Sequence, residues 1–170
     1  GAILAFFDFS AFLTQTIGLQ YTTPGINAFL TATYCVIVPF AWWVVAHRHP
    51  SFCNVGAAVV AVMGIWLVAV STSGETLTLG LGEGLTQVCA LLFSIHIVLV
   101  SRFSRGRDVL TLTVFQFIFE GLFGLCVGGL FETPPAISLI TPEVMGQMVF
   151  LIVFASVVAF GIQNVSLAYV

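Results

Sequence analysis

The sequence predicts an all-α protein, a polytopic bundle of transmembrane helices. Only 6% of the 170 residues are charged and 59% are apolar, with a mean hydropathy of +1.15. Soluble domains carry about 25% charged residues, so this composition excludes a water-soluble domain. Six stretches are long and apolar enough for a bilayer, which needs about 17–25 residues per helix. The four arginines form no basic patch, which argues against nucleic-acid binding.

The six predicted spans follow one another with short connections, so neighbouring spans run antiparallel. They cover residues 1–19, 25–46, 54–71, 84–101, 109–131 and 144–168. The first five end at stretches rich in turn-forming or polar residues: 22–25, 47–50, 71–75, 104–108 and 133–135. Pro39 lies inside the second span and removes a backbone hydrogen bond, so we expect it to kink that helix as a hinge.

The charges predict the orientation of the spans. All four arginines fall in the loops 47–50 and 102–108, which share one side of the membrane. The third and fifth loops lie on the other side of the membrane, and they contain the glutamates Glu75, Glu83, Glu132 and Glu143. Short cytoplasmic loops carry an excess of Arg and Lys, so the arginine loops are expected in the cytoplasm.

The chain also contains a weak internal repeat. Residues 6–21 align with 154–169 at an offset of 148, with six identities, among them Phe12/Phe160 and Gln15/Gln163. The two copies lie in the first and sixth spans, five spans apart in order, and an odd offset means that they cross the membrane in opposite directions. We therefore expect two inverted five-helix repeats, with two further spans before Gly1 and two after Val170, ten in all. The first repeat supplies residues 1–71, a loop follows at 72–83, and the second repeat supplies 84–170.

Three segments carry a family resemblance: TIGLQYTTPGINAFLTATYCVIVPFAWW at 16–43, LFSIHIVLVSRFS at 92–104 and FGIQNVSLAY at 160–169. In this order they resemble spans three to eight of the EamA-type carriers of the drug/metabolite transporter superfamily. The resemblance implies inverted five-helix repeats in a plasma membrane and transport of small metabolites or drug-like solutes. It does not extend to Asp8, a position where such carriers mostly have an apolar or small residue.

Three ionisable side chains lie inside predicted spans, where each is a candidate for proton coupling: Asp8, His96 and Glu120. A charged side chain at the centre of a membrane helix costs about 2.5–3.5 kcal/mol on insertion scales, so such residues often have a function. Asp8 and Glu120 are both predicted near the midplane. The alternative is that each stays neutral and only bonds a neighbouring helix.

The aligned segments of the first and sixth spans each carry a stripe of aromatic and amide side chains, and these two stripes suggest a pathway for a solute. The candidate pathway residues are Phe12 and Gln15 in the first span, Phe160, Gln163 and Asn164 in the sixth, and Tyr34 in the second. Phe12 and Gln15 share one helical face, as do Phe160 and Gln163. The alternative is ordinary hydrogen bonding between helices, worth about 0.6 kcal/mol on average in membranes.

The function that these residues predict is secondary transport of a small solute by alternating access, in the export direction, with protons as the coupling ion. The bilayer and the solute are the expected partners. No hydrolase motif such as GxSxG or HExxH occurs, so we expect no enzymatic activity, cofactor or metal site. A channel or a non-transporting membrane scaffold is the alternative, although channels usually build pores from several copies.

Overall fold

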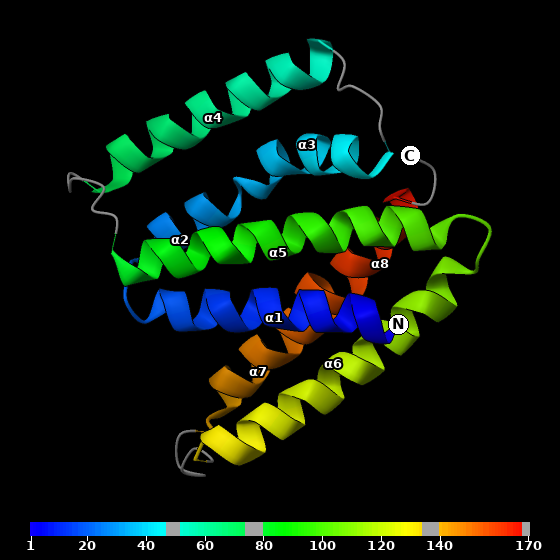
Figure 1. Cartoon of the computed structure of the whole chain (residues 1–170). Helices are drawn as coiled ribbons and strands as arrows, with labels where there is room; N and C mark the ends of the chain where they lie inside the picture. Colours follow the sequence, from blue (N-terminus) through cyan, green and yellow to red (C-terminus); the bar gives the residue numbers. More distant parts are fainter. Residues whose placement is uncertain (47–51, 74–79, 134–139, 168–170) are drawn as a thin grey trace. The chain divides into compact units, whose positions relative to one another are not determined.

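A computed structural model describes residues 1–46, 52–73, 80–133 and 140–167, and this part of the chain contains helices and no strand (Figure 1). Within it, five stretches are long and apolar enough to cross a membrane: Ala2–Leu19, Pro24–Val45, Leu81–Ser104, Val109–Phe131 and Pro142–Leu167. The predicted all-α, polytopic membrane architecture is therefore confirmed. Arg48, Glu75 and the loop 47–50 lie outside the described residues.

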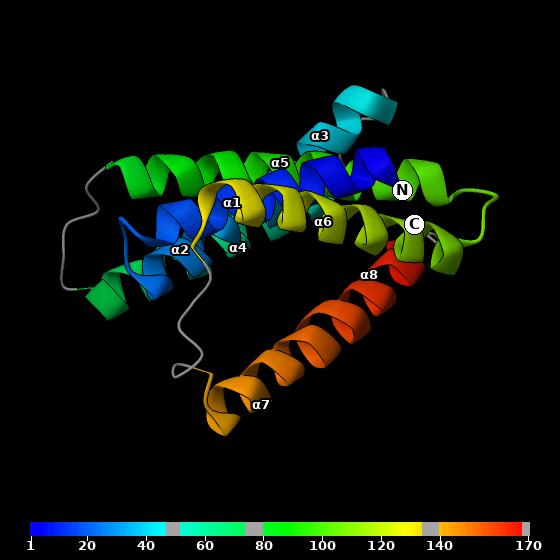
Figure 2. The same cartoon turned by 90° about the horizontal axis from the view of Figure 1, so that it is seen from below.

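The chain divides into two compact units, which we describe separately. The first, called the hairpin unit, covers Phe7–Leu99, and the second, called the C-terminal unit, covers Gly1–Phe6 and Val100–Val170. The helices that lie wholly or mostly in the hairpin unit are α1 (Ala2–Leu19), α2 (Pro24–Thr31), α3 (Tyr34–Ala46), α4 (Phe52–Ser73) and α5 (Leu81–Ser104). Figures 1 and 2 both show α1 and α5 side by side, and α4 contacts α2 and α3.

The second predicted span is two helices and not one. Thr23 caps α2, because its hydroxyl accepts a hydrogen bond from the Ile26 N–H at 3.4 Å. The interruption follows at Ala32–Thr33, where the Thr33 N–H and hydroxyl both donate to the Leu30 carbonyl, at 3.2 and 2.6 Å. This i→i−3 bonding ends α2 before α3 begins. Pro39 lies within α3, after the interruption, and its role as a hinge stays a prediction.

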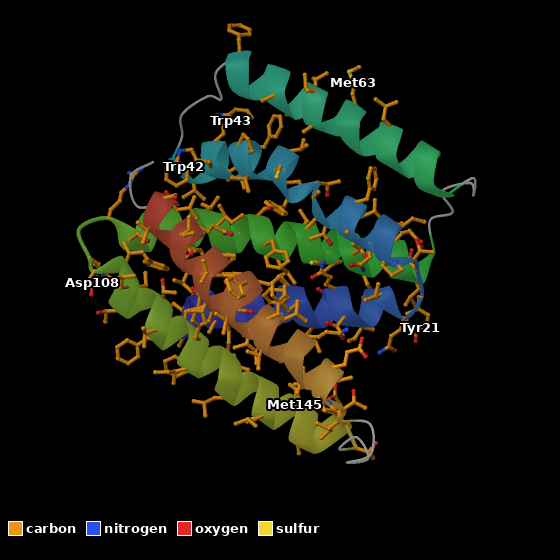
Figure 3. The ribbon with its side chains drawn as sticks, turned by 180° about the vertical axis from the view of Figure 1, so that it is seen from behind. Tyr21, Trp42, Trp43, Met63, Asp108 and Met145 are labelled. Atoms are coloured by element: carbon orange, nitrogen blue, oxygen red, sulfur yellow. The ribbon has the colours of Figure 1, made fainter. Side chains whose placement is uncertain are left out.

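The helices of the C-terminal unit are α6 (Val109–Phe131), α7 (Pro142–Phe150), the π-helical segment η2 (Leu151–Val158) and α8 (Ala159–Leu167). Asp108 caps α6, where Figure 3 labels it, and its carboxylate accepts from the N–H groups of Leu110 and Thr111. A hydrogen bond from the Thr111 hydroxyl is the main cause that lowers the pKa of Asp108 below 3.8. Figure 2 shows α7 diverging from α6, whereas α8 contacts it.

The last predicted span is continuous but not α-helical throughout. Thr141 caps it by accepting from the Val144 N–H at 3.3 Å, and Pro142 opens its first turn. Its middle, Leu151–Val158, is a π-helix, in which the Ser156 hydroxyl donates to the Leu151 carbonyl, five residues earlier, at 3.3 Å. Such i→i+5 winding is rare, and the composition of this apolar stretch does not predict it.

Candidate functional site

The pairing of α1 with α5 positions the candidate site. Three close approaches follow one another along the two helices: Gly18 with Gly82, Phe12 with Phe93, and Asp8 with His96. As the residue number falls on α1, it rises on α5, so the helices run antiparallel. We call the line of polar and aromatic side chains along this pair the seam: Asp8, Phe12, Gln15, Asn27, Thr31, Tyr34, Thr86, Phe93 and His96.

Two glycines let the backbones of α1 and α5 approach at one end of the seam. A Cβ atom on Gly82 would lie 2.9 Å from the backbone carbonyl carbon of Tyr21 and 3.0 Å from the Gly18 carbonyl oxygen. A Cβ atom on Gly18 would lie 3.1 Å from the Gly82 carbonyl oxygen. Small residues allow such close packing of membrane helices, and here they bring the polar side chains that follow within hydrogen-bonding distance.

A hydrogen-bonded cluster of amides and hydroxyls comes next. The Asn27 amide donates to the Gln15 backbone carbonyl at 3.2 Å and to the Thr86 hydroxyl at 3.0 Å. The Gln15 amide donates to the Thr31 hydroxyl at 3.0 Å, and that hydroxyl donates to the Asn27 carbonyl at 2.8 Å. Asn27, Thr31 and Thr86 are buried, whereas Gln15 is partly exposed. The cluster thus ties α2 to α1 and α5 and leaves one amide side chain accessible.

Three aromatic rings continue the seam. Phe12 meets Phe93 edge to face, with 5.1 Å between ring centroids and an interplanar angle of 88°. Tyr34, from the first turn of α3, lies 6.2 Å from the same Phe93 ring. Phe12 is 40% exposed and Tyr34 is half-buried, so this part of the seam presents accessible ring surface. Such rings can cover the apolar part of a ligand while neighbouring amides bind its polar part.

The seam then reaches a buried ionisable pair. The Nδ1 atom of His96 lies 3.7 Å from Oδ1 of Asp8, and both side chains are 0% exposed. This separation is longer than a direct hydrogen bond but within the range of an ion pair. Cys89, another titratable residue near Asp8, is also buried on α5. Asp8 and His96 are separate candidates in the sequence, and the structure brings them together.

The remaining candidates lie in the C-terminal unit. Glu120 on α6 is partly buried and accepts a hydrogen bond at 2.8 Å from Gln116, one turn earlier on the same helix. Asn164 is 2% exposed, and its amide donates to the Thr113 hydroxyl at 2.9 Å, which links α8 to α6. Gln163, next to it, is partly exposed. Asn164 therefore makes an inter-helix hydrogen bond, as the alternative interpretation of the stripes expects.

Both repeated phenylalanines pack in the same way. Phe160 lies 6.1 Å from Phe117 of α6 with an interplanar angle of 65°, an edge contact like that between Phe12 and Phe93. Both aligned phenylalanines thus meet another ring at an edge, but Phe93 and Phe117 both belong to the predicted second repeat, so the repeat does not relate the two contacts. Among the described residues, no group of three or more His, Cys, Asp or Glu side chains could hold a metal ion.

Sequence reasoning missed the partners on α2 and α5. Thr31 and Thr86 are ordinary residues of membrane helices, and composition gives them no special weight. A signal was nevertheless present in and just before the fourth predicted span, where Gly82, Thr86, Cys89, Phe93 and His96 recur at intervals of three or four residues. This spacing places them on one face of a helix.

The coupling between Asn27 and Thr86 is measurable. We expect Asn27→Ala and Thr86→Ala each to lower the free energy of unfolding, and the double variant to lose less than the sum of the two. The difference should be about 0.6 kcal/mol, the average for hydrogen bonds between membrane helices. Reversible unfolding in mixed micelles measures it. Pairing Asn27→Ala with Thr14→Ala is the control, because the Thr14 hydroxyl bonds carbonyls of α1 itself. Strict additivity for Asn27 and Thr86 would contradict the contact.

Comparison with known proteins gives one informative relative. The chain is 29% identical over 161 residues to a protein of Archaeoglobus fulgidus described as an uncharacterized transporter. The alignment covers 92% of this chain and 48% of the relative, so the chain spans about half the length of that protein. No family model and no solved structure matches. The chain is a multi-pass membrane protein of helices, and over most of its length it is similar to a transporter.

Proposed function

We propose that the protein is a secondary transporter that moves a small metabolite or drug-like solute across the membrane. The observation that carries the proposal is the seam, which lines one antiparallel helix pair with accessible ring surface and an accessible amide. Inside a hydrocarbon layer, polar side chains gathered along one helix face are a common feature of solute pathways. The similarity to a transporter supports the same conclusion. No chemical conversion of the solute is part of this function.

We further propose that transport follows alternating access between two inverted five-helix repeats of the EamA type, in the direction of export. The offset of 148 residues and the six identities in that alignment support the repeat. A relative about twice as long leaves room for ten spans. The plasma membrane is the proposed location, with the arginine loops 47–50 and 102–108 in the cytoplasm.

The seam suggests which solutes are bound. Gln15 offers hydrogen bonds to a polar group, while Phe12 and Tyr34 offer ring faces and edges to an apolar or aromatic group. These three side chains come from α1 and α3, and all three are at least partly accessible. The proposed solute is therefore a small amphipathic molecule, polar at one end and apolar or aromatic at the other.

Counterflow in proteoliposomes tests the function. Vesicles loaded with unlabelled amino acids, nucleosides or a fluorescent aromatic cation are diluted into the same labelled compound, and a carrier accumulates label by exchange. We expect one of these compounds to exchange, and Gln15→Ala to weaken exchange about 3- to 10-fold, the cost of about one hydrogen bond. Thr14→Ala is the matched control, because its hydroxyl bonds only carbonyls of its own helix among the described contacts.

Three results would contradict the proposal. Flux down a gradient without counterflow would indicate a channel, and the absence of any flux from correctly inserted protein would favour a membrane scaffold. Equal exchange by the Gln15→Ala and Thr14→Ala variants would remove the seam from the pathway even if the protein transports.

A further inference from the structure

We propose that Asp8 and His96 act as one site that binds a single proton, and that this proton is the ion whose movement drives the solute. The coupling role rests on the proposed function, whereas the proton site does not. The two side chains lie 3.7 Å apart on adjacent antiparallel helices, and neither is exposed. The site therefore belongs to the pair and not to either residue alone.

The charge balance of the pair favours one bound proton. With one proton the pair is neutral overall, either as a carboxylate beside an imidazolium or as a carboxylic acid beside a neutral imidazole. Removing that proton leaves a net charge of −1, and adding a second leaves +1. A buried net charge is costly in a low-dielectric interior, so both of these states are disfavoured until water reaches the pair. Strongly interacting groups of this kind titrate together.

The titratable and charged residues described nearest the pair lie on α5 and α3. One is Cys89 on α5, and a thiol is neutral when buried. The charged residues of α5 are Glu83 and Arg102, which lie about 20 Å and 9 Å from His96 along the helix axis. Tyr34, the titratable residue of α3 in the seam, packs on Phe93. Glu120 differs from Asp8 because its described polar partner is the neutral amide of Gln116.

The position of the pair links the proton to the solute. Asp8 lies one helical turn from Phe12 and two from Gln15, on the same face of α1. His96 lies about one turn from Phe93, which contacts both Phe12 and Tyr34. A change in the spacing of α1 and α5 would therefore alter the proton site and the solute-contacting rings together. In an exporter, a proton from external water binds the pair, and the same proton leaves to cytoplasmic water as the solute moves out.

Infrared and NMR titration of the protein in lipid vesicles tests the proton site without any solute. We expect the Asp8 carboxyl band, of the carboxylic acid or of the carboxylate, and the imidazole ¹⁵N signals to change at one common pH midpoint. Asp8→Asn should remove that band and move the His96 midpoint by about tenfold or more in proton concentration, the effect of losing a charge at this distance. Asp108→Asn, which alters an exposed carboxyl outside the spans, should leave both unchanged. Independent midpoints for the two residues would overturn the shared site.

Transport measured with the solute that passes the counterflow screen tests the coupling. We expect Asp8→Asn and His96→Gln each to abolish accumulation driven by a pH gradient and to retain counterflow, while Asp108→Asn keeps both. Driven accumulation that survives in Asp8→Asn but is lost in Glu120→Gln would overturn the proposal and assign the coupling to Glu120. If no solute shows counterflow, the proposed function fails, and the coupling role fails with it. The proton site is then still decided by the titration alone.

Discussion

Replacing Gly82 by Ala is expected to lower the free energy of unfolding by about 1–3 kcal/mol, the range measured for overpacked interiors. The added methyl group would lie 2.9 Å from the carbonyl carbon of Tyr21 and 3.0 Å from the carbonyl oxygen of Gly18. Both contacts are with backbone atoms, so no side-chain rotation relieves them. The helices α1 and α5 must then separate, and the hydrogen bonds of the seam lengthen with them.

The matched control is Gly84→Ala, two residues further along the same helix. A Cβ atom there meets nothing within 4 Å among the described residues, and Ala is the better helix former by about 1 kcal/mol. We therefore expect opposite signs for the two substitutions when unfolding in detergent micelles is followed by circular dichroism. Equal stability of the Gly82→Ala and Gly84→Ala variants would show that α1 and α5 do not approach as closely as described.

The second prediction with a large effect concerns the orientation of α6 in the membrane, and its readout is whether a cysteine is labelled or not. In a background without the four native cysteines, Glu132→Cys should react with a membrane-impermeant maleimide on intact cells. Arg105→Cys should react only after the membrane is opened. These positions flank α6, whose 23 residues extend about 34 Å, enough to cross a hydrocarbon core of about 30 Å. The positive-inside rule places Arg105 in the cytoplasm and therefore Glu132 outside.

Both side chains are exposed, so unequal access to the reagent comes from the membrane and not from burial in the protein. Labelling of both variants after permeabilisation is the control for reactivity. The reverse pattern would invert the proposed orientation. Reaction of both cysteines on intact cells would show that α6 does not span the bilayer.

The number and location of most helices could be predicted from the sequence because bilayer thickness alone sets the length of an apolar span. The predicted spans 1–19 and 109–131 agree with α1 and α6 to within one residue. Helix ends that are polar were harder to predict. The fourth span was expected over 84–101, whereas α5 runs from Leu81 to Ser104, since Glu83 and Arg102 can lie in its terminal turns without leaving the membrane surface.

The break at Ala32–Thr33 and the π-helix at Leu151–Val158 were not predicted, because both depend on local hydrogen bonds within apolar sequence. In the break, the Thr33 side chain bonds the Leu30 carbonyl, but Thr14, Thr86 and Thr113 make similar bonds within unbroken helices, so the presence of a Thr does not predict the break. The pairing of Asp8 with His96 was missed for another reason. Periodicity gives the face of a residue on its own helix, but not the helix that the face will meet.

The stretch from Pro142 to Leu167 has a further consequence for how the protein assembles. Its most apolar 18-residue window has a mean hydropathy of 2.2, and no residue of that window is buried against the described protein. Its backbone hydrogen bonds are made within the segment, so lipid alone can keep it folded. Insertion of this segment into the bilayer is thus separable from its packing against the rest of the protein. That packing is found at the α8 end, where Asn164 and Phe160 contact α6. Biogenesis can complete the insertion of this segment before any tertiary contact forms.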